Sequence, residues 1–341
     1  MTVPKDAPQR DGQEPTKAGF GTLAIVIPVW NLPQDLGALL DQVADLGVFE
    51  QVIVVDDASD PPCDPAALGY DAARLNADLV ALRPGVRGGA GHARNLGLAS
   101  VTADHVLFFD ADDRLSADFT RIWRLHRDHP QGAPDFTIFR HHDTRVDGGG
   151  SFPTEEAIWT DALGCAPHAM LDRDAQLKLA MISAYPWNKI YRTDFLRRHD
   201  IACSESPVHN DIRLHWLGFA HARRVQAVRA AGATHVVGHR DHHLTTRNGE
   251  ERLCLFPILS ELLPALRAAR AEPRLMQNFL RFADNICRWN LNLIEPSLIP
   301  RFRDLTKAIY LQFTPDEFAL FAMDHPDQAE HMIRFLMQES V

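Results

Sequence analysis

Long hydrophobic runs, cysteine pairs and an excess of basic charge are all missing from this sequence. No uninterrupted apolar stretch approaches the roughly 18–20 residues that a membrane-spanning helix needs. The five cysteines form no Cys-x-x-Cys pair, so neither a zinc ribbon nor a disulfide framework is supported, and a reducing compartment is expected. The formal net charge of −10 argues against a general nucleic-acid binder, which would present a basic face.

The ends of the chain differ from its middle in composition. Residues 1–20 lack an apolar stretch and mix prolines with polar residues, so they are predicted to form a disordered tail rather than a signal peptide. With 45% hydrophobic residues overall, the rest of the chain can bury a core. We expect an α/β domain over 21–248 and a helical C-terminal region over 249–341, in a soluble cytoplasmic protein.

Buried strands alternate with helices through the first part of the chain. Apolar runs at 23–29, 51–55, 79–83 and 105–109 predict strands that are covered on both faces. Between them we expect one helix from Pro33 to a stop at Gly47, and another from Gly88 to about residue 99. This alternation predicts an α/β fold with an open, doubly wound, mostly parallel sheet.

The later part of the chain is predicted to be less regular at first and then helical. A helix over 116–129, with Ser116 as its cap, and a strand near 135–140 extend the sheet, whereas 141–170 is expected to be irregular. Proline-separated helices are then expected over four segments: 251–270, 273–293, 298–312 and 315–337.

Carboxylates follow the strand that ends at Phe109. Asp110, Asp112 and Asp113 share the short turn after this strand, where their mutual repulsion is costly without a cation. Hard oxygen ligands favour Mg²⁺ or Mn²⁺, which keep positions open for substrate phosphates. The alternative is a turn that simply favours aspartate.

Two further polar segments follow neighbouring strands, and ligands of such sheets bind beyond the carboxyl ends of the strands. Asp57 lies where a carboxylate can accept hydrogen bonds from a nucleobase or ribose, although an Asx-type turn would explain the same residues. The segment from Gly88 to Gly91 allows a close backbone approach before a helix, and Arg94 adds a cation there. A dinucleotide fingerprint is disfavoured, because Gly-x-Gly-x-x-Gly is not met.

In order along the chain, the motifs IVIPVWN (25–31), VVDDASD (54–60), GGAGHARNLG (88–97) and FFDADD (108–113) resemble those of glycosyltransferase family 2, which has the GT-A, nucleotide-diphospho-sugar transferase-like fold. The segment WNKIYR (187–192) is similar to that of bacterial members that build cell-surface polysaccharides. The resemblance covers about residues 22–245 and leaves the helical C-terminal appendage outside it.

The resemblance implies a role for each matching residue. Pro28 and Asp57 match positions that contact the nucleoside, and Arg94 falls on a motif beside the donor. Asp110 and Asp112 match the DxD ligands of metal and ribose, and Asp113 could share the metal.

Family members invert the anomeric carbon by direct displacement with a carboxylate base, which Asp211 matches, although Asn210 replaces the usual Glu. An ordinary helix-terminal acid is the alternative for Asp211. His239 and Arg240 are candidates to contact the donor diphosphate, and a solvated loop is the alternative for this segment. The implied partners are a nucleotide-sugar donor and a saccharide or lipid-linked acceptor.

Other features favour structural roles. The histidines of 209–243 form no zinc motif, and Trp187 and Trp289 are expected to pack in the core, with a sugar contact as the alternative for Trp187. Residues 267–307 hold eight Arg or Lys against four acids, a local balance of +4. We expect mostly surface pairs there, with peripheral contact to anionic lipid at the inner face of the membrane as the alternative.

Three functional alternatives stay open beside glycosyl transfer. A DxD phosphatase or phosphotransferase would need Thr or Val where Arg114 stands. A non-catalytic relative that binds nucleotide sugars is motivated by Asn210. A nucleotidyltransferase lacks support, because its long glycine-rich loop after the first strand is absent.

Overall fold

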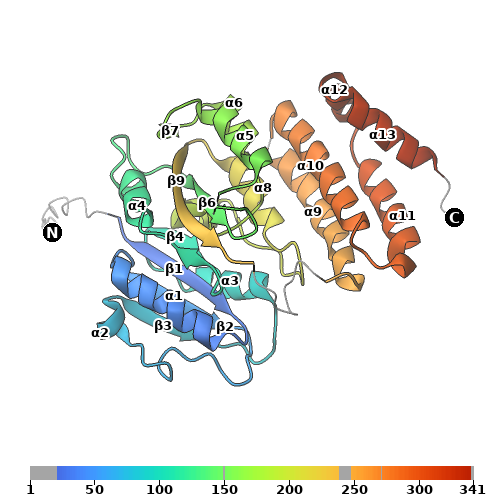
Figure 1. Cartoon of the computed structure of the whole chain (residues 1–341). Helices are drawn as coiled ribbons and strands as arrows, with labels where there is room; N and C mark the ends of the chain where they lie inside the picture. The colour runs from blue at the N-terminus through green and yellow to red at the C-terminus, as the bar shows by residue number, and fades with distance from the viewer. Residues whose placement is uncertain (1–20, 149, 238–246, 270, 339–341) are drawn as a thin grey trace, which may run out of the picture.

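The computed structural model describes residues 21–148, 150–237, 247–269 and 271–338. Its centre is one sheet with the strand order β3-β2-β1-β4-β8-β6-β9-β5, and β7 pairs with β9 (Figure 1). The strands are β1 (Leu23–Val29), β2 (Gln51–Asp56), β3 (Asp78–Leu82), β4 (His105–Phe108), β5 (Arg114–Leu115), β6 (Phe136–Asp143), β7 (His168–Met170), β8 (Lys189–Arg192) and β9 (Val225–His235).

The first half of the sheet is parallel, so the carboxyl ends of its strands lie at one edge. β1 pairs in parallel with β2 and with β4, and β2 pairs in parallel with β3. β8 then runs antiparallel to both β4 and β6, and β9 returns parallel to β6. The predicted open, mostly parallel α/β sheet is confirmed.

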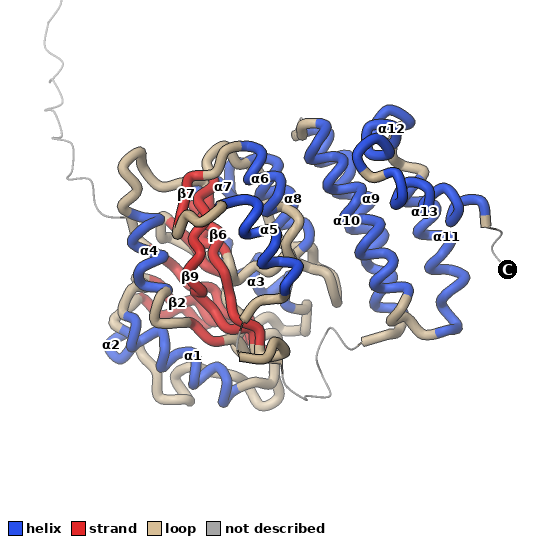
Figure 2. The backbone as a smooth tube through the Cα atoms, turned by 45° about the horizontal axis from the view of Figure 1, so that its top comes forward, coloured by secondary structure: helices blue, strands red, loops and turns tan. Residues whose placement is uncertain are grey.

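Helices cover both faces of the sheet (Figure 2). Two hydrophobic clusters follow from this: one lies between the sheet and α1 and α4, and the other lies under α3 and α5–α8. The helices of this part are α1 (Pro33–Leu46), α2 (Ala72–Leu75), α3 (Ala90–Ala99), α4 (Phe119–Arg127), α5 (Pro153–Leu163), α6 (Arg173–Leu179), α7 (Thr193–Arg198) and α8 (Ile212–His221).

The stop of α1 at Gly47 is confirmed. Gly47 has a φ of 56°, a left-handed conformation that glycine adopts without a side-chain clash, and its N–H donates to the Val43 carbonyl at 3.2 Å. Leu36, Leu39 and Leu40 are buried against the sheet. The helix therefore ends where the sequence predicts and delivers the chain into β2.

Three of the predicted boundaries are wrong. Ser116 does not cap α4, because the helix begins at Phe119 and the Ser116 hydroxyl donates to the Ala231 carbonyl of β9. The segment 141–170 is not irregular throughout, since it holds the end of β6 as well as α5 and β7. The last predicted helix is two helices, because Pro326 lacks the N–H that a continuous helix would need.

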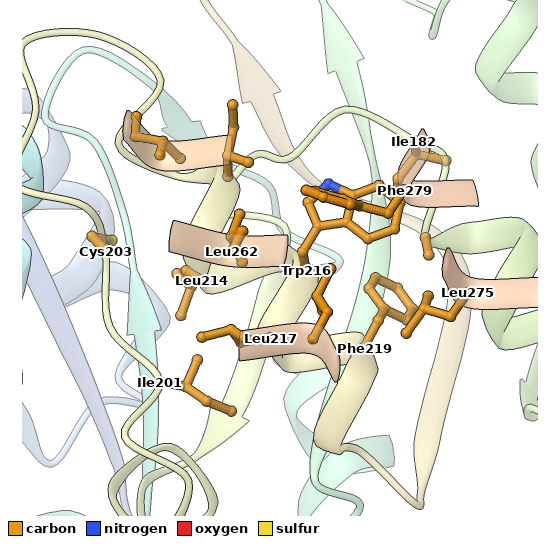
Figure 3. Close-up of a cluster of buried hydrophobic side chains, with 14 of the residues drawn as sticks. Ile182, Ile201, Cys203, Leu214, Trp216, Leu217, Phe219, Leu262, Leu275 and Phe279 are labelled. Carbon is orange, nitrogen blue, oxygen red and sulfur yellow. The ribbon is translucent and has the colours of Figure 1, made fainter. Parts of the chain in front are cut away.

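The C-terminal region is helical, as expected, and packs on α8. It contains η2 (Glu250–Cys254), α9 (Leu255–Ala268), α10 (Pro273–Leu291), η3 (Pro296–Leu298), α11 (Ile299–Tyr310), α12 (Pro315–Asp324) and α13 (Pro326–Met337). Figure 3 shows Trp216 of α8 among side chains that include Leu262 and Phe279. One hydrophobic cluster continues from β1 to α13, so the boundary between 248 and 249 stays a prediction.

Four of the eight basic residues in 267–307 form ion pairs. Ion pairs join Arg267 to Glu317, Arg274 to Asp174, Arg288 to Asp284 and Arg301 to Glu250. Across the described ranges, no helix combines the length and the apolar character needed to cross a membrane.

Replacing Trp216 with alanine should lower the free energy of unfolding by about 3–5 kcal/mol, because the side chain is fully buried and its loss leaves a cavity. Its ring centre lies 5.1 Å from that of Phe279, so the contact between α8 and α10 would be lost as well. Urea unfolding measures the effect. Leu311→Ala is the control, since Leu311 is 72% exposed, and equal effects of the two changes would contradict this packing.

Candidate active site

A pocket of about 680 Å³ opens beyond the carboxyl ends of β1, β2 and β4. It brings together the predicted site residues that the structure describes: Pro28, Asp57, Arg94, Asp110, Asp112, Asp113 and Asp211. His239 and Arg240 lie outside the described residues. Another pocket, of about 400 Å³, lies beside α4 and contains none of the predicted site residues.

Asp57 fixes the glycine-rich segment to the end of β2. Its two carboxylate oxygens accept hydrogen bonds from the N–H groups of Gly88 and Gly89, at 2.8 and 2.7 Å. The side chain is 3% exposed, and Arg87 lies 3.8 Å away. These two amides are therefore engaged within the protein, while the Asp57 carboxylate still lines the pocket and keeps lone pairs for a ligand.

Glycine at position 91 permits a close approach between the start of α3 and the loop before α8. A Cβ atom at Gly91 would lie 2.0 Å from the Ser204 carbonyl oxygen and 2.9 Å from the Asn210 Cβ. Any side chain would push these segments apart. Gly88, Gly89 and Gly91, which the sequence predicted to approach a ligand, thus make close contacts within the protein.

Arg94 joins the two halves of the pocket. Its Nη1 donates to Asn210 Oδ1 at 2.5 Å, and its Nη2 makes an ion pair with Asp110. Burial opposes the charge of this 3% exposed side chain, but Asp110 outweighs it and the pKa of Arg94 is raised. The guanidinium thereby holds the turn after β4 beside the loop that carries Asp211.

The aspartates after β4 repel one another electrostatically. Burial raises the pKa of Asp113 well above its usual value, and the charges of Asp110 and Asp112 raise it further. One Asp113 oxygen accepts the Val236 N–H at 2.9 Å, which fixes this side chain. A cation near Asp110 and Asp112 would relieve the repulsion.

The carboxylates of this turn fit a cation that takes some of its ligands from the protein and the others from a substrate and water. Within the described ranges, no three His, Cys, Asp or Glu side chains are grouped closely enough to hold a metal. Mg²⁺ binds through one or two carboxylates and takes substrate phosphates and waters as its other ligands. Asp110 and Asp112 are the residues that would supply the carboxylates.

Asp211 lies at the start of α8 with its carboxylate in the pocket. Its side chain makes no capping hydrogen bond to the helix, and an acid that the helix dipole favours stays the alternative explanation. Burial raises the pKa of Asp211, whereas the nearby Arg94 lowers it. A carboxylate with a raised pKa is a better proton acceptor than an exposed one.

Lys189 interacts electrostatically with Asp211, and the stacked rings of Tyr185 and Trp187 lie in the same part of the pocket wall. Burial lowers the pKa of Lys189 to about 7, although the carboxylates of Asp211 and Glu155 act to raise it. Its Nζ donates a hydrogen bond to the Tyr185 carbonyl at 2.7 Å. Trp187 is 1% exposed and stacks on Tyr185 with ring centres 4.5 Å apart, yet both residues line the pocket. Trp187 is thus a core residue that also reaches the pocket wall.

Sequence reasoning missed two features of the pocket. The hydrogen bond from Arg94 to Asn210 joins residues 116 positions apart, and no local sequence pattern indicates it. Trp289, expected to pack in the core, is 42% exposed and lines the pocket with Arg252 and Arg247.

The first part of the chain is similar in sequence to a known family. Residues 24–161 match the sequence model described as Glycosyl transferase family 2. No curated protein gave a significant match. The family match includes the proposed donor residues Asp57, Arg94 and Asp110, and it ends before Asp211.

The fold is similar to solved glycosyltransferases at low sequence identity. Residues 1–349 of S. aureus TarS, in complex with UDP-GlcNAc, superpose with a TM-score of 0.68 at 16% identity, covering 92% of this chain and 90% of that one. The longer S. aureus TarS chain gives 0.66 at 19% identity, with 92% and 54% covered. The mannosyltransferase PcManGT from Pyrobaculum calidifontis, in complex with GDP-Man and Mn²⁺, gives 0.54 at 16% identity, with 94% and 86% covered.

Asp57→Asn should loosen the glycine-rich segment, because the amide NH₂ cannot accept the second backbone N–H. We expect the free energy of unfolding to fall by about 1–3 kcal/mol. Hydrogen exchange at the amides of Gly88 and Gly89 should become faster. Asp60→Asn, in the same turn but outside the pocket, is the control, and exchange that stays unchanged in Asp57→Asn would contradict the role of Asp57.

Lys189→Met should change how stability depends on pH. The unfolded lysine keeps its proton to about pH 10.5, whereas the folded one loses it near pH 7, so the unfolded state binds more protons between these values. Wild-type stability should therefore rise with pH relative to the variant, by up to about 1.4 kcal/mol per pH unit.

Urea unfolding of both proteins from about pH 6 to about pH 9 measures this difference. A stability difference that does not vary with pH would mean that folded Lys189 keeps its proton.

Proposed function

We propose that the protein moves a sugar from a nucleotide-diphosphate donor to a saccharide or glycolipid acceptor, with inversion at the anomeric carbon; the match of residues 24–161 to the model of glycosyl transferase family 2 supports this proposal. The observation that carries this proposal is the pocket in which Arg94 links Asp110 to the loop of Asp211. The carboxylate proposed to bind the donor, Asp110, and the one proposed as the base, Asp211, thereby line the same pocket.

The donor side of this space is the part formed by the ends of β1 and β2 and by the turn after β4. Pro28 and Asp57 lie where a nucleoside can contact them, and Asp57 keeps lone pairs for a base or ribose N–H or O–H. The S. aureus TarS and PcManGT structures, which contain UDP-GlcNAc and GDP-Man, support a donor of this class. Mg²⁺ or Mn²⁺ bound to Asp110 and Asp112 would neutralise the departing diphosphate.

The acceptor side is the part formed by the loop before α8. Asp211 takes the proton of the acceptor hydroxyl as its oxygen attacks the anomeric carbon. The bond between that carbon and the phosphate oxygen breaks, and its electron pair leaves with the nucleoside diphosphate. The new glycosidic bond forms on the opposite face of the sugar, so the configuration inverts.

Asn210 is compatible with this reaction. Its Oδ1 accepts from Arg94, so an uncharged side chain at this position helps to orient the guanidinium. The observation weakens the main reason to regard the protein as a non-catalytic binder of nucleotide sugars. A phosphatase of the DxD type is not favoured, because Asp110, which would be its nucleophile, is ion-paired with the buried Arg94.

The cellular setting that we propose is the cytoplasmic face of a membrane, in the synthesis of a cell-surface polysaccharide. The WNKIYR segment supports it by its resemblance to polysaccharide-building members of the family. The basic residues of the C-terminal helices would suit peripheral contact with anionic lipid, although many of them are engaged in ion pairs.

Asp211→Asn should reduce transfer by about 10²–10⁴-fold while nucleotide binding persists, because only the base is lost. The rate can be followed as release of nucleoside diphosphate from UDP-GlcNAc or GDP-Man with a panel of saccharide acceptors.

Asp112→Asn should instead weaken Mn²⁺-dependent binding of the donor, measured by calorimetry.

The pH profile provides a further check on Asp211. Since burial raises the pKa of Asp211, the wild-type rate should fall with decreasing pH through a midpoint above the ordinary value for a carboxyl group. Wild-type rates in folded Asp211→Asn would refute the base assignment. Donor binding by the wild type with neither transfer nor hydrolysis would favour the non-catalytic alternative.

A further inference from the structure

One wall of the pocket comes from the helical C-terminal region, beyond the residues that match the family. Arg252 lies in η2 and Trp289 near the end of α10, while Arg247 lies three residues before η2. All three line the same pocket as Asp110 and Asp211. The C-terminal region therefore contributes directly to the space in which a substrate would bind.

Trp289 is exposed where other tryptophans are buried. Its side chain is 42% exposed, whereas four others are at most 2% exposed: Trp123, Trp159, Trp187 and Trp216. A large indole left in contact with water at a pocket wall loses the free energy that burial would give it. A ligand that covers the ring would recover part of it.

The Trp289 ring is held in place by two polar neighbours. The Arg252 guanidinium lies 5.0 Å from the ring centre, within the range of a cation–π interaction. The His209 ring lies 6.0 Å from it at an angle of 74°, an edge-to-face arrangement. The indole is thus positioned before any ligand binds.

Both neighbours are fixed in turn by Asn290. The Asn290 Oδ1 accepts Arg252 Nη1 at 2.8 Å and lies 3.0 Å from His209 Nε2, while Nδ2 donates to the Ile286 carbonyl. Asn290 is fully buried and Arg252 is 1% exposed. Burial lowers the pKa of His209 to about 4, so the ring is neutral near pH 7 and can donate through Nε2.

We propose that Trp289 is a specificity-determining residue that stacks on a pyranose ring of the acceptor saccharide. The inference rests on the proposed function. The acceptor hydroxyl must reach Asp211, and His209, which contacts the indole, precedes Asp211 by two positions. The proposed donor residues Pro28 and Asp57 line the pocket from the ends of β1 and β2. A flat aromatic face complements the apolar C–H surface of a sugar ring and leaves its hydroxyls free for polar contacts.

The test compares wild type with Trp289→Ala and Trp289→Phe, each loaded with UDP or GDP and Mn²⁺. Saturation-transfer NMR measures binding of the methyl pyranosides of glucose, galactose, mannose and N-acetylglucosamine. We expect at least one glycoside to bind wild type, to bind Trp289→Ala about tenfold more weakly, and to bind Trp289→Phe nearly as well as wild type, since phenylalanine keeps an aromatic face. Leu293→Ala is the control, because Leu293 is 38% exposed and does not line the pocket.

The outcomes separate this inference from the proposed function. Calorimetry of wild type with UDP, GDP and Mn²⁺ is measured first, and failure to bind any nucleotide would overturn the proposed function and the inference with it. If a nucleotide binds but no glycoside does, or if glycosides bind Trp289→Ala as tightly as wild type, the inference alone is overturned. Equal losses in the alanine and phenylalanine variants would also overturn it, because stacking predicts rescue by phenylalanine.

Discussion

The buried guanidinium of Arg94 is the interaction on which the arrangement of the pocket depends. A charge that is 3% exposed must be paired, and here Asp110 supplies the counter-charge while Asn210 accepts the second nitrogen. Removing one partner from such a pair costs about 3–5 kcal/mol, because the remaining charge stays buried. The pair therefore fixes the turn after β4 against the loop before α8, two segments that only the fold brings together.

This constraint explains two choices of residue. Position 91 must be glycine, because a Cβ atom there would collide with the Ser204 carbonyl and separate α3 from the loop. Position 210 is occupied by an amide next to a region already rich in carboxylates, where burial and then the charges of Asp110 and Asp112 raise the pKa of Asp113. The amide accepts a hydrogen bond from Arg94 without adding another negative charge.

The sequence predicted the parallel half of the sheet well, since β1 and β2 are continuous apolar runs and Gly47 marks the end of α1. Of the proposed site residues, those that the structure describes line one pocket, because the carboxyl ends of parallel strands share an edge; their roles stay predictions. It missed α5, whose weak pattern of buried residues lies in a stretch with many polar residues. Contacts of long range, such as that between His209 and Asn290, have no local pattern.

The most direct test of the account is a crystal structure of the protein with UDP or GDP and Mn²⁺. The account predicts that the diphosphate lies beside Asp110 and Asp112, that the nucleoside contacts Asp57, and that Arg94 still bridges Asp110 and Asn210. A nucleotide bound outside this pocket, or a metal held without either Asp110 or Asp112, would contradict it.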